Sequence, residues 1–337
     1  MTGGRRWLRG GLSRLADIPS VRRLMRLGAR ELLRAADAGE DRSRRRGGPP
    51  GGSGDGGAVA YDGSYFGVGR DPSGDRQGRS GYASYDRVSS NADIAAYLLW
   101  RNFRVTRTLD VGCATGYLVE ALRELGVEAY GCDASRYAIE HATPGAAGAL
   151  SVGDPVEGLP YDDGSFELVT ALEILEHLPP EQVPAAVAEI RRVCTGLVYA
   201  TIPSFGPNES GPDGHFDGKV RPERLARFEG LGASYGGPVP RSDLAVDADG
   251  HPIEGHLTIA SFAWWEARFA EAGFERRGDV ERRLYRDIEP AGLAPFWNLY
   301  VFAVPGTPAA MTEPLRPDAT LSELGLHHPL LEASAGR

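Results

Sequence analysis

One stretch, residues 108–117 (TLDVGCATGY), constrains the fold of this chain more than any other. An apolar strand ends in Asp110, a glycine-rich turn follows, and a helix is expected to begin near Tyr117. A strand, a glycine turn and a helix together place backbone N–H groups and a helix N-terminus beside a small ligand. The stretch therefore predicts an α/β fold that binds a ligand at the end of this strand.

The acids around the turn indicate which ligand it suits. The next strand ends at Asp133, 17 positions after Gly116, where a carboxylate can hold the two hydroxyls of a ribose. Dinucleotide sites favour G-x-G-x-x-G, whereas here Asp110 precedes Gly112, Ala114 and Gly116 at every second position. A carboxylate in front of the turn repels a pyrophosphate and favours a ligand with an amino group. A nicotinamide oxidoreductase is therefore the disfavoured alternative.

Strands and helices alternate along the chain in the manner of a doubly wound sheet. The Asp162-Asp163-Gly164 turn leads into the fourth of these strands. The predicted helices cover residues 117–125, 134–141 and 184–193, and the predicted strands cover 107–111, 127–132, 149–152, 166–171, 196–202 and 297–304.

Two further motifs carry a resemblance to a known family. Residues 153–167 (GDPVEGLPYDDGSFE) and 172–178 (LEILEHL) follow the third and fourth predicted strands. With the glycine turn, they resemble class I S-adenosylmethionine (SAM)-dependent methyltransferases, whose first motif reads D/E-x-G-x-G-x-G. Ala114 replaces the middle glycine. The group that includes ubiquinone-biosynthesis, natural-product and sugar methyltransferases is the most similar.

That resemblance covers residues 61–204 well and 256–304 in outline. It implies a Rossmann-like sheet of seven strands in which the last strand is antiparallel, and it implies SAM as the cofactor. The implied cofactor-binding residues are Asp110 near the methionine amino group, Gly112, Ala114 and Gly116 for close approach, Asp133 and Ala134 at the ribose, Asp154 and Pro155 at the adenine, and Glu173 beside the methyl donor.

Aromatic residues ahead of the core are candidates for covering the cofactor. Residues 61–66 (YDGSYF) resemble the leading segment of many small-molecule methyltransferases, which folds over the cofactor as a lid. We expect Tyr65, Tyr82 and Tyr85 to stack on the ligand or to hydrogen-bond to it. Packing of these side chains against a helix at the sheet edge is the alternative.

The residues that act on the methyl acceptor are less defined than those for the donor. A hydroxyl acceptor benefits from a base, and His177 lies at the carboxyl end of the fourth predicted strand. A helix-capping role is its alternative. His215 with Asp217, together with His251 or His256, could form a competing base pair or ligate a divalent metal. We expect His177, His215 and His251 to be the catalytic candidates, and we expect no metal.

The ends of the chain differ in composition from the core. Residues 1–46 carry 13 arginines against five acids, which favours a basic amphipathic arm that touches a membrane surface or an acidic partner, or is merely solvated. The predicted organisation is the arm at 1–46, a flexible linker at 47–60, a lid and helix at 61–105, a core at 106–304 with a substrate-lid insertion at 205–255, and a tail at 305–337.

Composition limits the classes of function. The net charge of −9 gives no bulk attraction for nucleic acid, so no nucleic-acid partner is expected. No apolar run is long enough for a membrane span, and three separated cysteines without C-x-x-C favour a reducing cytoplasm. The chain has a single lysine, Lys219, and we ascribe this preference for arginine to coding bias.

We therefore expect a SAM-dependent methyltransferase acting on a small molecule: a sugar, a glycosylated or polyketide natural product, or a phenol. O-methylation is favoured over N- or C-methylation, and a homodimer is compatible with the long insertion. The alternative is a catalytically inactive SAM-binding scaffold or regulatory partner. The two hypotheses differ in one feature: an active enzyme should place a catalytic group from residues 205–256 next to the methyl donor, and a scaffold should not.

Overall fold

The computed structural model describes residues 65–66, 85–216, 218–231, 235–247, 250–289 and 298–314, with the backbone alone at 229–231. These residues belong to one compact unit of the chain. The predicted basic arm at 1–46, the linker at 47–60, Tyr82 and Asp217 lie outside the described residues.

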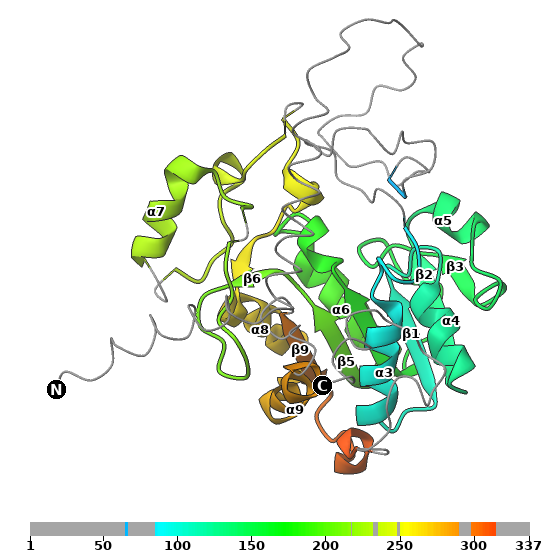
Figure 1. Ribbon diagram of the computed structural model, residues 1–337. Helices are drawn as coiled ribbons and strands as arrows, with labels where there is room; N and C mark the ends of the chain where they lie inside the picture. The colour runs from blue at the N-terminus through cyan, green and yellow to red at the C-terminus, as the bar shows by residue number, and fades with distance from the viewer. Residues whose placement is uncertain are drawn as a thin grey trace, which may run out of the picture. The chain divides into compact units, whose positions relative to one another are not determined.

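A seven-stranded sheet forms the centre of this unit (Figure 1), with the strand order β3-β2-β1-β4-β5-β9-β8. Strands β1 to β5 pair in parallel, and β9 is antiparallel to both β5 and β8. The predicted doubly wound sheet with an antiparallel last strand is confirmed. The strands are β1 (Arg107–Val111), β2 (Glu128–Asp133), β3 (Leu150–Val152), β4 (Phe166–Leu172), β5 (Cys194–Thr201), β8 (Glu275–Arg276) and β9 (Leu299–Ala303).

Helices cover both faces of the sheet and bury two separate apolar cores. α3, α4 and α9 contribute to one core, and α6 and α8 contribute to the other. Central strands such as β4 (FELVTAL) are apolar nearly throughout because both of their faces are covered. The helices are α3 (Ala92–Asn102), α4 (Tyr117–Glu124), α5 (Arg136–Glu140), α6 (Val183–Val193), α7 (Pro222–Leu231), α8 (Phe262–Glu271) and α9 (Gly278–Ile288). No described helix has the length and apolar character needed to cross a membrane.

The insertion after β5 is more regular than its composition suggests. It contains α7, and its two ends pair as a short parallel ribbon of β6 (Ser204–Phe205) and β7 (Ala260–Ser261). Phe205, Phe216 and Phe228 form a small apolar cluster of its own, in which the Phe205 and Phe216 rings stack 4.4 Å apart. Glycine and proline punctuate this segment without preventing it from forming a packed layer.

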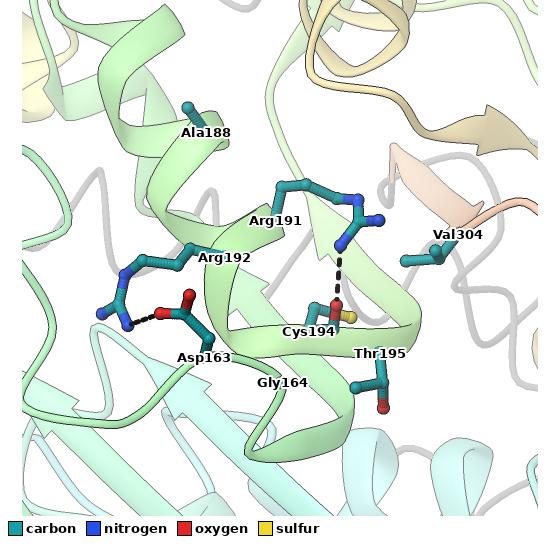
Figure 2. A pocket seen from close by; sticks show the side chains of 8 residues that line it. All are labelled: Asp163, Gly164, Ala188, Arg191, Arg192, Cys194, Thr195 and Val304. Atoms are coloured by element: carbon teal, nitrogen blue, oxygen red, sulfur yellow. Dashed lines mark hydrogen bonds and ion pairs between the residues drawn. The ribbon is translucent and has the colours of Figure 1, made fainter.

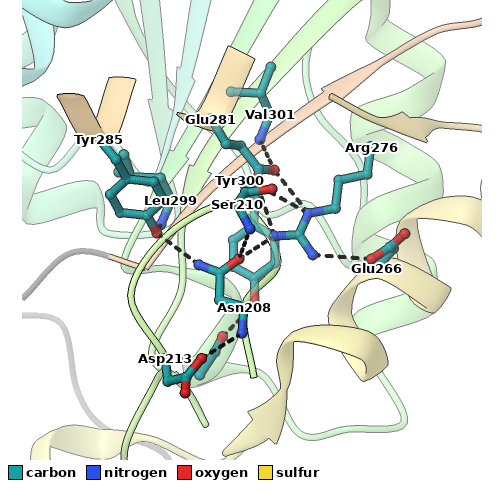
Figure 3. A network of polar contacts seen from close by, with 11 residues as sticks. Asn208, Ser210, Asp213, Glu266, Arg276, Glu281, Tyr285, Leu299, Tyr300 and Val301 are labelled. Atoms are coloured by element: carbon teal, nitrogen blue, oxygen red, sulfur yellow. Dashed lines mark hydrogen bonds and ion pairs between the residues drawn. The ribbon is translucent and has the colours of Figure 1, made fainter. Parts of the chain in front are cut away.

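A buried polar network fastens the insertion to the last two strands (Figure 3). The Arg276 guanidinium on β8 donates to Glu281 at 2.8 Å and to the Asn208 side-chain oxygen at 3.0 Å. Glu281 is fully buried and also accepts the Val301 backbone N–H at 3.0 Å. A buried ion pair with this many hydrogen bonds has its charges satisfied, so it fixes the start of the insertion in place.

Helix α9 has no counterpart among the predicted helices. Its apolar residues Val280, Leu284 and Ile288 recur at helical spacing and are buried, while its arginines occupy the remaining face. Beyond the predicted core, the chain reaches back to the domain at Met311, whose carbonyl accepts the Arg104 backbone N–H at 2.9 Å.

Candidate functional site

The glycine turn, residues 110–116, joins β1 to α4 in a conformation that suits glycine. Gly112, Ala114 and Gly116 have φ values of 76°, 48° and 89°, all in the left-handed region. A Cβ at Gly116 would lie 2.7 Å from the Ala146 Cβ, so this position excludes any side chain. Ala114 adopts the same region at a cost of roughly 1–2 kcal/mol relative to glycine. The turn therefore brings backbone close to whatever lies at the end of β1.

Asp133 holds this turn from the end of the neighbouring strand β2. One carboxylate oxygen accepts the Ala114 N–H at 2.8 Å, and the other accepts the Ser135 N–H at 2.7 Å. Burial raises the pKa of Asp133, and these two hydrogen bonds act in the opposite direction. A carboxylate has about four acceptor positions, so two hydrogen bonds leave capacity for a ligand. Ala134 next to it is exposed.

Asp110 lies inside the sheet, with only 5% of its surface exposed. The Thr170 hydroxyl on β4 donates to it at 2.6 Å. Burial, with a smaller contribution from Asp133, raises the pKa of Asp110 to about 7. The side chain therefore joins β1 to β4 from a buried position.

Asp154 and Pro155 follow β3 at the same edge of the sheet. An Asp154 carboxylate oxygen accepts the Val156 N–H at 2.7 Å, and the Gly158 N–H donates to the Asp154 carbonyl at 2.8 Å. Pro155 is buried and Asp154 is partly exposed. The carboxyl ends of parallel strands are where open α/β sheets bind ligands. Asp110 near the end of β1, Asp133 at the end of β2 and Asp154 after β3 all lie there.

Aromatic side chains gather beside the glycine turn. Phe66 packs with Ala114 of the turn and stacks on Tyr137 at 6.0 Å, and Tyr65 meets Phe66 edge-to-face at 5.1 Å. Tyr85 lies 5.6 Å from the Tyr117 ring at the start of α4. This arrangement fits both the predicted lid over a ligand and simple packing at the sheet edge.

A second group of polar residues lies beyond the carboxyl end of β4, and we call it the Glu–His cluster: Glu176, His177, Lys219, Glu254 and His256. Glu176 is fully buried, and among the described residues its carboxyl group has no side-chain hydrogen-bond partner other than Glu173. The His177 and His256 rings lie 5.0 Å apart and nearly perpendicular. His256 Nε2 is 3.9 Å from a Glu176 oxygen and 3.8 Å from a Glu254 oxygen.

Burial sets the ionisation of this cluster. It lowers the pKa of His177 to about 4 and that of His256 to about 2, so both imidazoles are neutral at pH 7. It raises the pKa of Glu176, and the Glu173 carboxylate adds to that rise. Lys219, which is 8% exposed, forms an ion pair with Glu254. The cluster thus contains two neutral imidazoles, two carboxyl groups and one ammonium group.

The structure places the predicted histidines differently from one another. His177 and His256 come together, although they are far apart in the sequence. His215 and His251 are exposed, and His251 lies in a surface turn, where its Nδ1 is 3.8 Å from Asp247. Among the described residues, neither joins the Glu–His cluster.

Sequence reasoning missed Glu176, Glu254 and Lys219. A usable signal was present, because Lys219 is the only lysine in a chain whose other strong bases are all arginine. Its burial beside two glutamates gives this residue a structural explanation that coding bias does not.

A surface pocket lies near the amino ends of the strands, at the end of the sheet opposite to the glycine turn (Figure 2). Gly164 precedes β4, and Cys194 and Thr195 begin β5, so the pocket borders the amino ends of these strands. The Arg192 guanidinium pairs with Asp163 at 2.7 Å on its rim. Since the acids and the glycine turn lie at the carboxyl ends, this pocket takes no part in their site.

Residues 109–197 match the family described as "Methyltransferase domain". This part of the chain is thus similar to methyltransferase domains. The match begins in β1 and ends in β5, so it contains the glycine turn, Asp133, Asp154 and the Glu173–His177 segment.

Curated relatives of this methyltransferase domain include ubiquinone biosynthesis O-methyltransferases from three bacteria. The one from Bordetella avium is 32% identical over 102 residues, which is 28% of this chain and 42% of the relative. That from Ralstonia nicotianae is 35% identical over 105 residues, 27% and 38% of the two chains. That from Mesorhizobium japonicum is 33% identical over 153 residues, 40% and 61%. The chain thus spans less than two thirds of each of these relatives.

Solved structures similar to the methyltransferase domain are more distant. "PigF with SAH" is 20% identical, with a TM-score of 0.40, over 63% of this chain and 54% of that one. The magnesium protoporphyrin IX methyltransferase of Synechocystis PCC 6803 with bound SAH is 15% identical, with a TM-score of 0.36, over 65% and 83%. These likenesses are too weak to transfer any site or substrate.

Proposed function

We propose that this protein is a SAM-dependent methyltransferase that transfers a methyl group to a hydroxyl oxygen of a small molecule. The observation that carries the proposal is the carboxyl edge of the sheet. There, one set of acids surrounds a left-handed glycine turn, and a second set lies beside two neutral histidines.

The first set fits the cofactor. Gly112, Ala114 and Gly116 let the backbone approach the methionine part, and Asp133 retains acceptor positions for the ribose hydroxyls. Asp154 and the buried Pro155 would hold the adenine, Ala134 would border the ribose, and Asp110 would support the turn near the methionine amino group. When bound, SAM supplies an electrophilic methyl group on a sulfonium.

The aromatic residues near the turn would cover this cofactor. Tyr65 belongs to the aromatic group that packs on Ala114, which makes it the described candidate for this cover. Tyr82 stays a proposal from the sequence alone. A cover that excludes water favours methyl transfer to the acceptor, because the reaction depends mainly on holding the two reactants in line.

The second set would bind the acceptor. Glu173 and His177 follow β4 directly, at the edge that holds the cofactor residues. With its pKa lowered to about 4, neutral His177 accepts a proton only weakly. An acceptor with a comparatively acidic hydroxyl, such as a phenol with a pKa of about 10, therefore suits the site better than an unactivated sugar hydroxyl.

Calorimetry with S-adenosylhomocysteine, the demethylated cofactor, tests the donor half of the proposal. We expect saturable binding, and we expect Asp133→Ala to weaken it by roughly 10- to 100-fold, because a charge-assisted hydrogen bond contributes about 1.5–3 kcal/mol. Asp162→Ala, at an exposed position in a turn, is the matched control and should bind as the wild type does. Absence of binding at millimolar ligand would refute the proposal.

Transfer of a labelled methyl group tests the acceptor half. We expect incorporation into phenols to exceed incorporation into sugars with unactivated hydroxyls. A protein that binds S-adenosylhomocysteine but transfers no label to any hydroxyl, amine or carbon acceptor would instead be a SAM-binding scaffold.

A further inference from the structure

We propose that Lys219 binds the reacting oxygen of the acceptor, and that the acceptor is a phenol which this ammonium group holds as its phenolate anion. The inference rests on the proposed methyltransferase function. It deepens that function by naming the charge on the acceptor and the residue that receives it. Lys219 belongs to the insertion and joins the Glu–His cluster through its ion pair with Glu254.

Lys219 is the exception among the strong bases of this chain. There are 37 of them, and all the others are arginines. The single lysine is buried, which lysines rarely are unless their charge is compensated. Arginine presents a wide planar fork of five donors, whereas lysine presents a compact point charge with three. A compact charge suits contact with one oxygen atom, such as that of a phenolate.

The backbone holds Lys219 firmly in place. Its N–H donates to the Phe216 carbonyl at 2.8 Å, and its carbonyl accepts the Ala245 N–H at 2.8 Å. The next residue, Val220, forms a β-bridge with Leu244. Only 9% of the lysine side chain is exposed. An ammonium group fixed in this way is preorganised to stabilise a negative charge that forms beside it.

The ammonium group has donors left after its ion pair. Among the described residues, Glu254 is the single side chain that pairs with Lys219. An ammonium group has three donors, so this pair leaves two of them for another oxygen. The Glu254 side chain is 62% exposed, and solvent weakens an exposed ion pair. Glu254 therefore compensates the charge of Lys219 only in part.

The charge of Lys219 also acts on the other members of the Glu–His cluster. Burial lowers the pKa of both His177 and His256, and the positive charge of Lys219 lowers both further. Lys219 opposes the rise that burial causes in the pKa of Glu176. His256 Nε2 lies 3.8 Å from Oε2 of Glu254, the same oxygen that pairs with Lys219. One lysine thus influences the whole region where the acceptor is proposed to bind.

Solvent reaches this region, so an acceptor can enter it. Glu173 and Glu254 are exposed, whereas Glu176 and Lys219 are buried. Glu173 and Glu254 also have left-handed backbone, with φ values of 54° and 57°, which at residues other than glycine tends to occur at functional sites. Carboxylates at the entrance repel anions. A phenol would therefore enter in its neutral form and ionise beside Lys219.

The positive charge would supply what the histidines lack. A hydroxyl is a strong nucleophile only after it loses its proton, and neutral His177, with its pKa lowered to about 4, is a weak base for that purpose. A cation beside a phenol favours the ionised form and lowers the pKa of the phenol from about 10. Lys219 thereby favours loss of the proton to water.

The methyl transfer that follows balances without another reactant. The phenol O–H bond has broken, and its proton is in water. An oxygen lone pair forms the new bond to the methyl carbon, and the carbon–sulfur bond breaks with its electron pair moving to sulfur. A phenolate and a sulfonium become a neutral methyl ether and a neutral thioether. The charge that Lys219 stabilises disappears in this step, which favours release of the product.

Ionisation of a bound phenol tests the proposal without any measurement of methyl transfer. 4-Nitrophenol is the probe, because it titrates near neutral pH and its phenolate absorbs visible light. It is titrated with pH in the presence of the full chain and S-adenosylhomocysteine, with and without EDTA. We expect the bound probe to be about tenfold more acidic than the free probe, since one nearby opposite charge lowers a pKa by about 1 or more.

Three variants show whether Lys219 causes this effect. Lys219→Met removes the charge at similar length and should return the acidity of the probe to that of the free compound. Lys219→Arg retains a charge and should keep part of the effect. Arg241→Met removes an exposed charge of the same insertion, and it is the matched control that should behave as the wild type does. Binding of S-adenosylhomocysteine shows that each variant is folded, and Lys219→Gln replaces Lys219→Met if the latter is not.

The possible results separate this proposal from the function on which it rests. Equal acidity of the probe on wild type and Lys219→Met, no saturable binding of the probe, or an effect that EDTA abolishes overturns the role of Lys219. In methyl transfer to a phenol, Lys219→Met should lose roughly tenfold in kcat/KM below the pKa of the free phenol and less above it, because solvent then ionises the phenol unaided. A loss that is the same at every pH indicates a structural role and also overturns the proposal. A wild type that acidifies the probe but transfers no methyl group refutes the methyltransferase function and leaves the anion site standing.

Discussion

The glycine turn and the Glu–His cluster lie at the same edge of one sheet and differ in how their polar groups are satisfied. At the turn, Asp133 and Asp110 accept hydrogen bonds from Ala114, Ser135 and Thr170. In the cluster, the only side chain of the described residues that hydrogen-bonds to Glu176 is another carboxyl, that of Glu173.

This difference indicates what each region needs from a ligand. The turn is held together by its own hydrogen bonds, so it can exist preformed and receive a ligand without rearrangement. The cluster instead carries the buried Glu176 carboxyl, which hydrogen-bonds to the Glu173 carboxyl and to no side-chain N–H group of the described residues, and the pKa of both groups is raised. The following predictions test this contrast between a self-sufficient region and an incomplete one.

The largest expected effect concerns Asp110, the one member of the glycine turn whose charge is poorly accommodated. Its pKa is about 7 in the folded protein, against an ordinary value of 3.8. Between these pH values the unfolded chain has lost its proton and the folded chain has kept it, so ionisation favours the unfolded chain. The contribution of Asp110 to stability is therefore intact below about pH 4 and declines as pH rises to about 7, by up to about 4 kcal/mol.

Asp110→Asn removes this titration while it retains an oxygen that can accept from Thr170. Denaturant unfolding of both proteins should show the wild type losing stability relative to the variant between pH 4 and pH 7. The exposed Asp162→Asn is the control and should follow the wild type. If the difference in unfolding free energy between the wild type and Asp110→Asn is constant with pH, the pKa of Asp110 is not raised in the folded protein.

A second prediction tests whether close packing, rather than φ alone, makes the turn preformed. Gly116 and Gly126 have similar φ values of 89° and 82°. A Cβ at Gly116 would meet the Ala146 Cβ at 2.7 Å, whereas one at Gly126 would have no heavy atom within 4 Å. Gly126→Ala should cost about 1 kcal/mol of unfolding free energy from backbone strain, and Gly116→Ala about 2–4 kcal/mol, because overpacking adds to the strain.

Thermal unfolding measures the loss of stability, and S-adenosylhomocysteine binding measures the loss of ligand affinity. Gly126→Ala should bind the ligand like the wild type, and Gly116→Ala should bind it more weakly. Equal destabilisation by the two substitutions would show that the turn has room to adapt, against the description of a rigid, preformed site.

The contrast also explains what the sequence revealed in advance. The turn is local: Asp110, Gly112, Gly116 and Asp133 lie within one strand–helix–strand unit, so their spacing encodes their geometry. The approximate bounds of the central strands followed from apolar runs of the right length, and the antiparallel last strand was implied by the family resemblance. Prediction of these features needed no knowledge of the tertiary structure.

The Glu–His cluster could not be predicted in the same way. Its members come from residues 176–177, 219 and 254–256, and only the folding of the insertion brings them together. The insertion looked irregular because its glycines and prolines obscure the helix α7 and the ribbon of β6 and β7. Helix α9 was missed because its charged residues outnumber its apolar ones, although Val280, Leu284 and Ile288 keep helical spacing.

The smallest expected effect is the change in stability when the buried Glu176 carboxyl is removed. Glu176→Leu replaces it with an apolar side chain of similar size. Exchange of buried charged groups for apolar ones is often neutral or stabilising, so we expect Glu176→Leu to raise the unfolding free energy by about 1 kcal/mol.

Denaturant unfolding of the wild type and Glu176→Leu measures this value. If Glu176→Leu is less stable than the wild type, the Glu176 carboxyl has stabilising partners in the folded chain, and the cluster would then be as self-sufficient as the turn.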